Sequence, residues 1–258
     1  MRLSLIGMAG TGKSYWANKL AEHGFRLFCC DDLISKKLAP LLKKPDGTTM
    51  RMGKWMGFPF HAGYKKRESK YLNFEIEVLN EILDYLEDHD NDLDEDIVVD
   101  TTGSVIYTGE GILKRLRQYT TVVHLSIPSE VREQLLRAYV SKPHPMLWRD
   151  IFSKEPGETN KEAMERCYPK LIIARQRLYD CNADVEIDYY TRREEGFGVS
   201  AFLHLAASKS QSKGKWKSPS IPLCERGKQS EYPDLLRCYK IPLSLKSPPS
   251  PLLKKAKS

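Results

Sequence analysis

The chain has 258 residues, enough to bury one sizeable hydrophobic core with a small appendage. Its net charge of +7 is uneven, because residues 209–258 carry 12 Lys and Arg against three Asp and Glu while residues 1–208 are close to neutral. No run approaches the roughly 18 apolar residues of a membrane span, and the first residues have no charged and apolar leader pattern. We therefore expect a cytoplasmic protein without membrane contact.

The six cysteines form no Cys-x-x-Cys pair and lie among alternating strand and helix signals. This placement predicts reduced thiols rather than a disulfide framework. The adjacent Cys29 and Cys30 are expected to be small apolar fillers of a strand rather than a redox pair.

Residues 7–14 match G-x-x-x-x-G-K-[ST], the pattern of a phosphate-binding loop. The preceding residues 2–6 are typical of a buried parallel strand, and Trp16, Leu20 and Ala21 recur at helical spacing after the loop. Glycines let backbone N–H groups approach an anion, and the following helix N-terminus adds partial positive charge. In this context we favour nucleotide binding over a glycine-rich turn that binds nothing. The expected nucleotide-binding residues are Gly7, Ala9, Gly10, Thr11, Gly12, Lys13, Ser14 and Tyr15.

The first half of the chain continues with a strand signal at residues 25–30 that ends on Asp31-Asp32, and with a helix over 33–42 broken by Pro40 and Pro45. Residues 43–66 are irregular and rich in aromatic residues. They are either a packed Ω-like excursion or a substrate-contacting segment. A long amphipathic helix follows through residues 71–86.

The second half repeats the alternation of strand and helix. Strands are predicted at 97–100, 121–127 and 185–188, and helices at 111–119, 129–139, 161–180 and 197–207. A polar stretch at 142–159 is expected to close over the site as a lid. The pattern predicts an α/β fold, a P-loop three-layer sandwich with a five-stranded parallel sheet and small lid and acceptor subdomains.

Residues 1–208 are expected to form the P-loop domain, and residues 209–258, rich in Lys, Ser and Pro, a disordered basic tail. No nucleic-acid partner is expected beyond weak contact through that tail. Within the domain, Gly7, Asp31 and Asp100 each follow a predicted strand. Ligands bind at the carboxyl ends of parallel strands, so these residues are expected to share one site.

Four segments carry a family resemblance: residues 5–14, Asp31-Asp32-Leu33-Ile34, residues 98–103 and residues 175–179. With them, residues 1–190 resemble the shikimate kinase family of P-loop small-molecule kinases. The resemblance implies ATP and Mg²⁺ as cofactors, and a small metabolite acceptor that bears a hydroxyl and a carboxylate. It places Gly103 on the floor of the acceptor site and Arg175 on the acceptor's carboxylate. Leu72 stands where a second carboxylate-binding arginine is expected.

The predicted mechanism is phosphoryl transfer, which needs positioning and charge neutralisation. Lys13, Asp31 and Asp100 are the expected catalytic residues: Lys13 contacts the β- and γ-phosphates, and Asp31 orients the acceptor hydroxyl or accepts its proton. Ser14 and Asp100 are expected at Mg²⁺. Positive charge for the transferring group is expected from Lys142, Arg149 or Arg137. Lys142-Pro143 sits where the family's lid has Arg-Pro.

The preferred prediction is a kinase that acts as a monomer, and two alternatives remain. One is a P-loop ATPase or nucleotide-binding regulator without a metabolite acceptor. The other is a degenerate kinase that binds nucleotide and serves as a scaffold.

Overall fold

The computed structural model describes residues 1–90 and 95–208. The predicted tail at 209–258, with Cys224 and Cys238, lies outside the described residues. The four cysteines that the structure describes are free thiols, as predicted. None of the described helices combines the length and apolar character needed to cross a membrane.

A single five-stranded sheet organises the domain. Its strands are β1 (Arg2–Ile6), β2 (Arg26–Cys29), β3 (Ile97–Asp100), β4 (Thr121–Leu125) and β5 (Val185–Ile187). They pair in parallel in the order β2-β3-β1-β4-β5. The register sets Asp100 opposite Leu5 of β1 and Cys29 of β2. The predicted parallel sheet is therefore confirmed, and its central strands end side by side.

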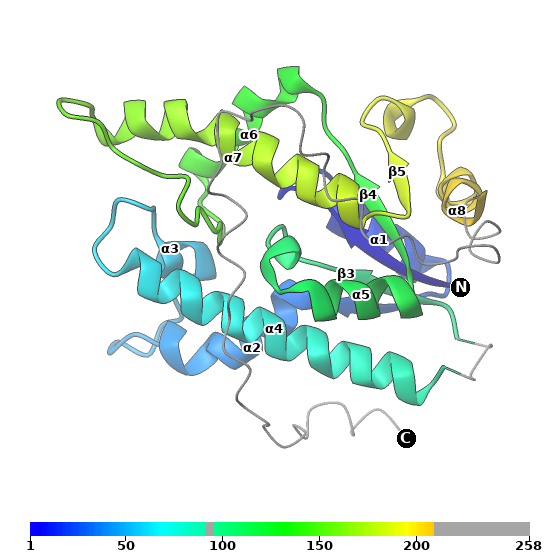
Figure 1. Ribbon diagram of the computed structural model, residues 1–258. Helices are drawn as coiled ribbons and strands as arrows, with labels where there is room; N and C mark the ends of the chain where they lie inside the picture. Colours follow the sequence, from blue (N-terminus) through cyan, green and yellow to red (C-terminus); the bar gives the residue numbers. More distant parts are fainter. Residues whose placement is uncertain (91–94, 209–258) are drawn as a thin grey trace.

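Helices cover both faces of the sheet (Figure 1). They are α1 (Lys13–Glu22), α2 (Cys30–Leu42), α3 (Met52–Met56), α4 (Tyr64–Asp88), α5 (Glu110–Tyr119), α6 (Arg132–Ser141), α7 (Asn160–Asn182) and α8 (Val199–Ser208), with 3₁₀ turns at Val105–Tyr107, Ser129–Val131 and Thr191–Arg193. On one face Trp16 of α1 stacks on Phe202 of α8, with ring centroids 4.8 Å apart. The other face carries the larger core, which α2, α4, α5 and α7 share.

Two features of α2 differ from the sequence expectation. α2 begins at Cys30, so Asp31 and Asp32 lie in its first turn rather than at the end of the strand. Carboxylates are favoured there because the helix N-terminus is partially positive. Pro40 lies inside α2, which continues to Leu42, whereas the sequence predicted a break at this proline.

The excursion between α2 and α4 packs against the predicted lid. An added Cβ at Gly53 of α3 would lie 2.0 Å from the carbonyl oxygen of Pro143. The two backbones are therefore in direct contact, and only a residue without a side chain fits. This contact packs α3 against the predicted lid, and a substrate-contacting role for residues 43–66 stays a prediction.

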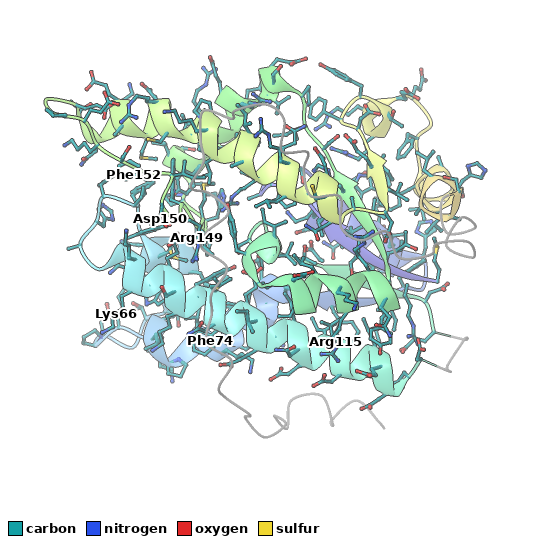
Figure 2. All side chains as sticks on the ribbon, in the orientation of Figure 1. Lys66, Phe74, Arg115, Arg149, Asp150 and Phe152 are labelled. Atoms are coloured by element: carbon teal, nitrogen blue, oxygen red, sulfur yellow. The ribbon has the colours of Figure 1, made fainter. Side chains whose placement is uncertain are left out.

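The segment after α6 is anchored to α4. Met146, Leu147 and Trp148 are buried. The Tyr64 hydroxyl accepts the Trp148 N–H at 3.0 Å, and Glu68 accepts the Arg149 N–H at 2.8 Å. Arg149 has a left-handed φ of 53°, a conformation that its bond to Glu68 helps to hold. Figure 2 shows Arg149, Asp150 and Phe152 between α7 and the start of α4.

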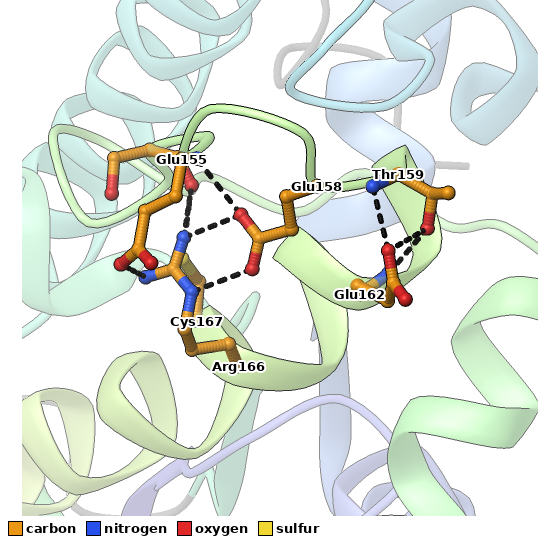
Figure 3. A network of polar contacts seen from close by, with 7 residues as sticks. Glu155, Glu158, Thr159, Glu162, Arg166 and Cys167 are labelled. Atoms are coloured by element: carbon orange, nitrogen blue, oxygen red, sulfur yellow. Dashed lines mark hydrogen bonds and ion pairs between the residues drawn. The ribbon is translucent and has the colours of Figure 1, made fainter.

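A charged network fixes the loop that leads into α7 (Figure 3). Arg166 forms a two-pronged pair with Glu158, at 2.7 and 2.8 Å, and a further pair with Glu155 at 3.2 Å. The hydrogen bonds from Arg166 hold the pKa of Glu158 at about 2. Thr159 and Glu162 form a reciprocal capping box at the helix start. The loop that closes the predicted lid stretch is thus tied to α7.

Candidate active site

The phosphate-binding loop connects β1 to α1 in the shape its sequence predicts. Gly7, Gly10 and Gly12 all have left-handed φ angles, of 141°, 85° and 97°. A Cβ at Gly7 would also lie 2.8 Å from the Leu125 carbonyl oxygen. All three positions therefore favour glycine for conformation, and Gly7 requires it for space as well. α6 covers the loop, because Leu135 packs against Gly10.

Lys13 is folded into the loop that it follows. Its ammonium group donates to the carbonyl oxygens of Gly7 at 2.9 Å and Met8 at 3.0 Å. Burial lowers the pKa of Lys13, and the nearby carboxylates of Asp100 and Asp31 act in the opposite direction. Within the described residues this buried cation donates to carbonyl oxygens and forms no ion pair, so it is well placed to gain an anionic partner.

Asp100 ends β3 beside the loop and is buried. The Ser14 hydroxyl hydrogen-bonds its carboxylate, while burial raises the pKa of Asp100. Its oxygen Oδ1 is buried and has no hydrogen-bond partner among the described residues. Mg²⁺ prefers oxygen ligands and takes one or two from a protein beside those of phosphates. The pair Ser14 and Asp100 therefore fits a nucleotide-bound Mg²⁺.

Asp31 faces the same place from the first turn of α2. Its Oδ1 accepts a hydrogen bond from the Tyr71 hydroxyl of α4 at 3.1 Å. The residue is exposed, but its carboxyl group is surrounded by protein on most sides, and this limited hydration raises the pKa of Asp31. A carboxylate with a raised pKa is a better proton acceptor than an ordinary one.

A second carboxylate, Glu75, lies fully buried one helical turn after Tyr71. It accepts hydrogen bonds from the hydroxyls of Thr102 and Ser104, the latter at 2.5 Å. Burial raises the pKa of Glu75 to about 7. The sequence interpretation missed this residue, although a charged side chain among the apolar positions of an amphipathic helix is a visible signal.

The turn after β3 joins the phosphate loop to α7 through Gly103. Its carbonyl oxygen accepts from Arg175 at 3.1 Å and from Tyr179 at 2.5 Å, and an added Cβ at Gly103 would lie 3.3 Å from the Ala9 nitrogen. Arg175 also donates to the Leu147 carbonyl oxygen at 2.5 Å and is only 2% exposed. The predicted carboxylate-binding role of Arg175 stays a prediction, and in this conformation its guanidinium group binds backbone carbonyls.

The remaining predicted contacts lie at the surface. Tyr15 is 60% exposed in the first turn of α1. Arg137 points into solvent and pairs with Glu133 at 3.2 Å, and Lys142 is exposed. The structure thus brings together Lys13, Ser14, Asp31, Asp100, Gly103 and Arg175, and leaves Tyr15, Arg137 and Lys142 outside that cluster.

Arg192 is a further residue that the sequence interpretation missed. It is buried in the 3₁₀ turn after β5, where it donates to the carbonyl oxygens of Ile187, Ser126 at 2.8 Å and Thr11 at 3.4 Å. It therefore ties the phosphate loop to the ends of β4 and β5. Burial lowers the pKa of Arg192 to about 10. No local pattern marks such a residue, because its partners are distant in the sequence.

The order of the strands, the glycine loop after β1 and the carboxylate at the end of β3 define the P-loop kinase class of α/β folds. The chain is also similar to solved structures. Shikimate kinase from Acinetobacter baumannii in complex with shikimate is similar at 22% identity over 84% of this chain and 95% of that chain, with a TM-score of 0.50. Shikimate kinase from Aquifex aeolicus and dephospho-CoA kinase from Campylobacter jejuni are 18% and 15% identical, each over 83% of this chain and over 100% and 98% of those chains, with TM-scores of 0.48 and 0.45.

Comparison with known protein families finds no match to this sequence, and comparison with curated proteins finds none either. The similarity to the Acinetobacter enzyme shows that the chain has a shikimate kinase-like P-loop kinase fold. The resemblance inferred from the motifs is confirmed at the level of the fold.

Proposed function

We propose that the protein is a kinase that transfers the γ-phosphate of ATP to a hydroxyl group of an acceptor. The observation that carries this proposal is the convergence of Lys13, Ser14, Asp100 and Asp31 at the carboxyl ends of β1, β2 and β3. A P-loop ATPase needs the first three of these residues. Asp31, held by Tyr71 beside them, adds a carboxylate suited to an alcohol.

Each residue has a distinct task in this proposal. Mg-ATP, when bound, supplies the phosphoryl group and neutralises part of its charge. Lys13 releases the carbonyl oxygens of Gly7 and Met8 and binds phosphate oxygens instead. Asp31 orients the acceptor hydroxyl and accepts its proton. Ser14 and Asp100 hold the metal ion.

The finer expectation of a small, carboxylate-bearing acceptor depends on two positions. Arg175 is buried against carbonyl oxygens, and Leu72 is apolar. These positions present no exposed cation to a carboxylate. The proposed reaction therefore requires a hydroxyl group on the acceptor and does not require an acidic group.

The test combines binding and turnover. Calorimetry with Mg²⁺ and ATP should register binding to the wild-type chain. With pooled alcohols, mass spectrometry should detect a phosphorylated product. Equal release of ADP with every pool and with none would favour the ATPase instead, and a lack of binding heat would refute both.

Lys13→Ala is the decisive variant. It should abolish turnover and spare the fold, because the ammonium group contacts phosphate-loop carbonyls and not the core. Lys19→Ala is the matched control, since Lys19 lies on the same helix in an exposed pair with Glu22. Loss of the circular dichroism signal in Lys13→Ala would contradict the assigned role.

A further inference from the structure

The lobe formed by α2, α3 and the first turns of α4 carries an excess of positive charge. Residues 30–70 contain ten Lys and Arg against four Asp and Glu. Two of these acids, Asp31 and Asp32, lie in the first turn of α2, and Glu68 is buried. Lys37 and Lys65 form ion pairs. Six further cations of the lobe are exposed and have no ion pair among the described residues. This basic patch consists of Lys36, Lys43, Arg51, Lys54, Lys66 and Lys70.

Both helices that carry most of the basic patch also contribute to the candidate active site. α2 carries Asp31 in its first turn, and Lys70 directly precedes Tyr71, which binds Asp31. At 1.5 Å per residue, Lys66 lies about 8 Å along α4 from Tyr71, and Lys43 about 18 Å along α2 from Asp31. Figure 2 shows Lys66 at the end of α4 that adjoins α3. The positive charge thus extends outward from the proposed acceptor hydroxyl.

Aromatic side chains are interleaved with these cations. Trp55, Phe58 and Phe60 lie on the same lobe, partly buried and packed against the core. The rings of Phe58 and Phe60 stack on each other with centroids 5.4 Å apart. Cations that follow a backbone of phosphates, together with aromatic faces for the bases, are the two features by which proteins hold single-stranded nucleic acid.

The dimensions favour a strand over a single nucleotide. Six like charges without counter-charges repel one another, and a polyanion relieves that repulsion. The distance of about 18 Å from Asp31 to Lys43 along α2 corresponds to about five phosphates at about 3.4 Å each. A small carboxylate would leave most of the patch unpaired.

We propose that the acceptor is a single-stranded nucleic acid whose terminal hydroxyl lies beside Asp31 and whose phosphates follow the basic patch. This inference rests on the proposed function, because it names the acceptor of the same reaction. The hydroxyl oxygen forms a new bond to the γ-phosphorus while the bond to the β–γ bridging oxygen breaks. ADP leaves with that electron pair, and the hydroxyl proton passes to the Asp31 carboxylate.

Binding is tested first, by fluorescence anisotropy of the full chain with a short, 3′-labelled oligonucleotide that has a free 5′-hydroxyl. The double variant Lys66→Glu/Lys70→Glu should weaken binding by about tenfold or more, because it removes two phosphate contacts and adds repulsion. Lys114→Glu/Arg177→Glu is the matched control, with the same change of charge at exposed residues of α5 and α7. Equal affinity of the two double variants would overturn the inference.

Phosphoryl transfer from labelled ATP is then followed to three separate acceptors: the oligonucleotide, adenosine 3′-monophosphate and shikimate. We expect label on the oligonucleotide, with its KM raised by Lys66→Glu/Lys70→Glu and not by the control. Label on shikimate or on the mononucleotide alone would overturn this inference and leave the proposed kinase function standing. Absence of Mg-ATP binding in calorimetry would instead overturn the proposed function itself.

Discussion

Glu75→Gln should change how stability depends on pH. Glu75 is fully buried, and its pKa is raised from 4.5 to about 7 in the folded chain. Burial is the main cause, and Asp31 adds to it, whereas the hydroxyls of Thr102 and Ser104 and the charge of Arg175 act in the opposite direction. Between pH 4.5 and 7 the folded state therefore holds a proton that the unfolded state has released.

The sign and size follow from proton linkage. Because the folded state binds more protons, the stability contributed by Glu75 is complete below pH 4.5 and is lost as the pH rises towards 7. A shift of 2.5 units at 1.36 kcal/mol each gives a loss of about 3 kcal/mol across this window. Glutamine resembles the neutral acid and does not titrate, so the variant lacks this decline.

The assay is urea unfolding of both proteins at several pH values from 4.5 to 8. The free energy of unfolding of Glu75→Gln relative to wild type should rise by about 3 kcal/mol over this range, and other titrating groups cancel in the difference. Glu77→Gln, on the same helix but half-exposed, is the matched control. A difference that stays flat, or that falls with pH, would refute the reasoning and mark Glu75 as a stabilised carboxylate.

Three further substitutions test the packing and the phosphate loop. Gly53→Ala should lower the stability measured by thermal unfolding by about 2 kcal/mol, because its Cβ would meet the Pro143 backbone. Gly111→Ala is the control and should not lower stability, because nothing lies within 4 Å of the added Cβ. Trp148→Ala should cost about 3–5 kcal/mol, since the ring is fully buried, and a loss below 1 kcal/mol would contradict that burial. Arg192→Met should weaken ATP binding about tenfold in calorimetry by freeing the Thr11 carbonyl, whereas Arg193→Met, whose side chain lies over Tyr189, is the control that should bind as wild type.

The sheet and the phosphate loop could be predicted because their signals are local. An apolar run before a glycine pattern fixes β1, the loop and α1 without knowledge of distant contacts. Asp100 was accessible in the same way, as a carboxylate that ends an apolar strand. The start of α2 could not be predicted in this way, because Asp31 and Asp32 fit the end of a strand and the first turn of a helix equally well.

The surroundings of the site depended on contacts between distant segments. Arg175 matches its motif well, yet no sequence pattern tells that Gly103 and Leu147 bind its guanidinium group. Glu75 is bonded to Thr102 and Ser104, which lie 27 and 29 residues further along the chain. Such pairings are set by packing, which residue spacing does not encode.

The buried segment Met146-Leu147-Trp148 limits how the region around the candidate active site can open. Exposing three buried side chains of this size costs about 5 kcal/mol or more. The state in which this segment is detached is therefore populated in fewer than about one in a thousand molecules. Tyr64, Glu68 and Gly53 hold the same segment from the side of α3 and α4. We therefore expect residues 146–148 to move together with α3 and the start of α4 in any opening of the site, and not as an independent loop.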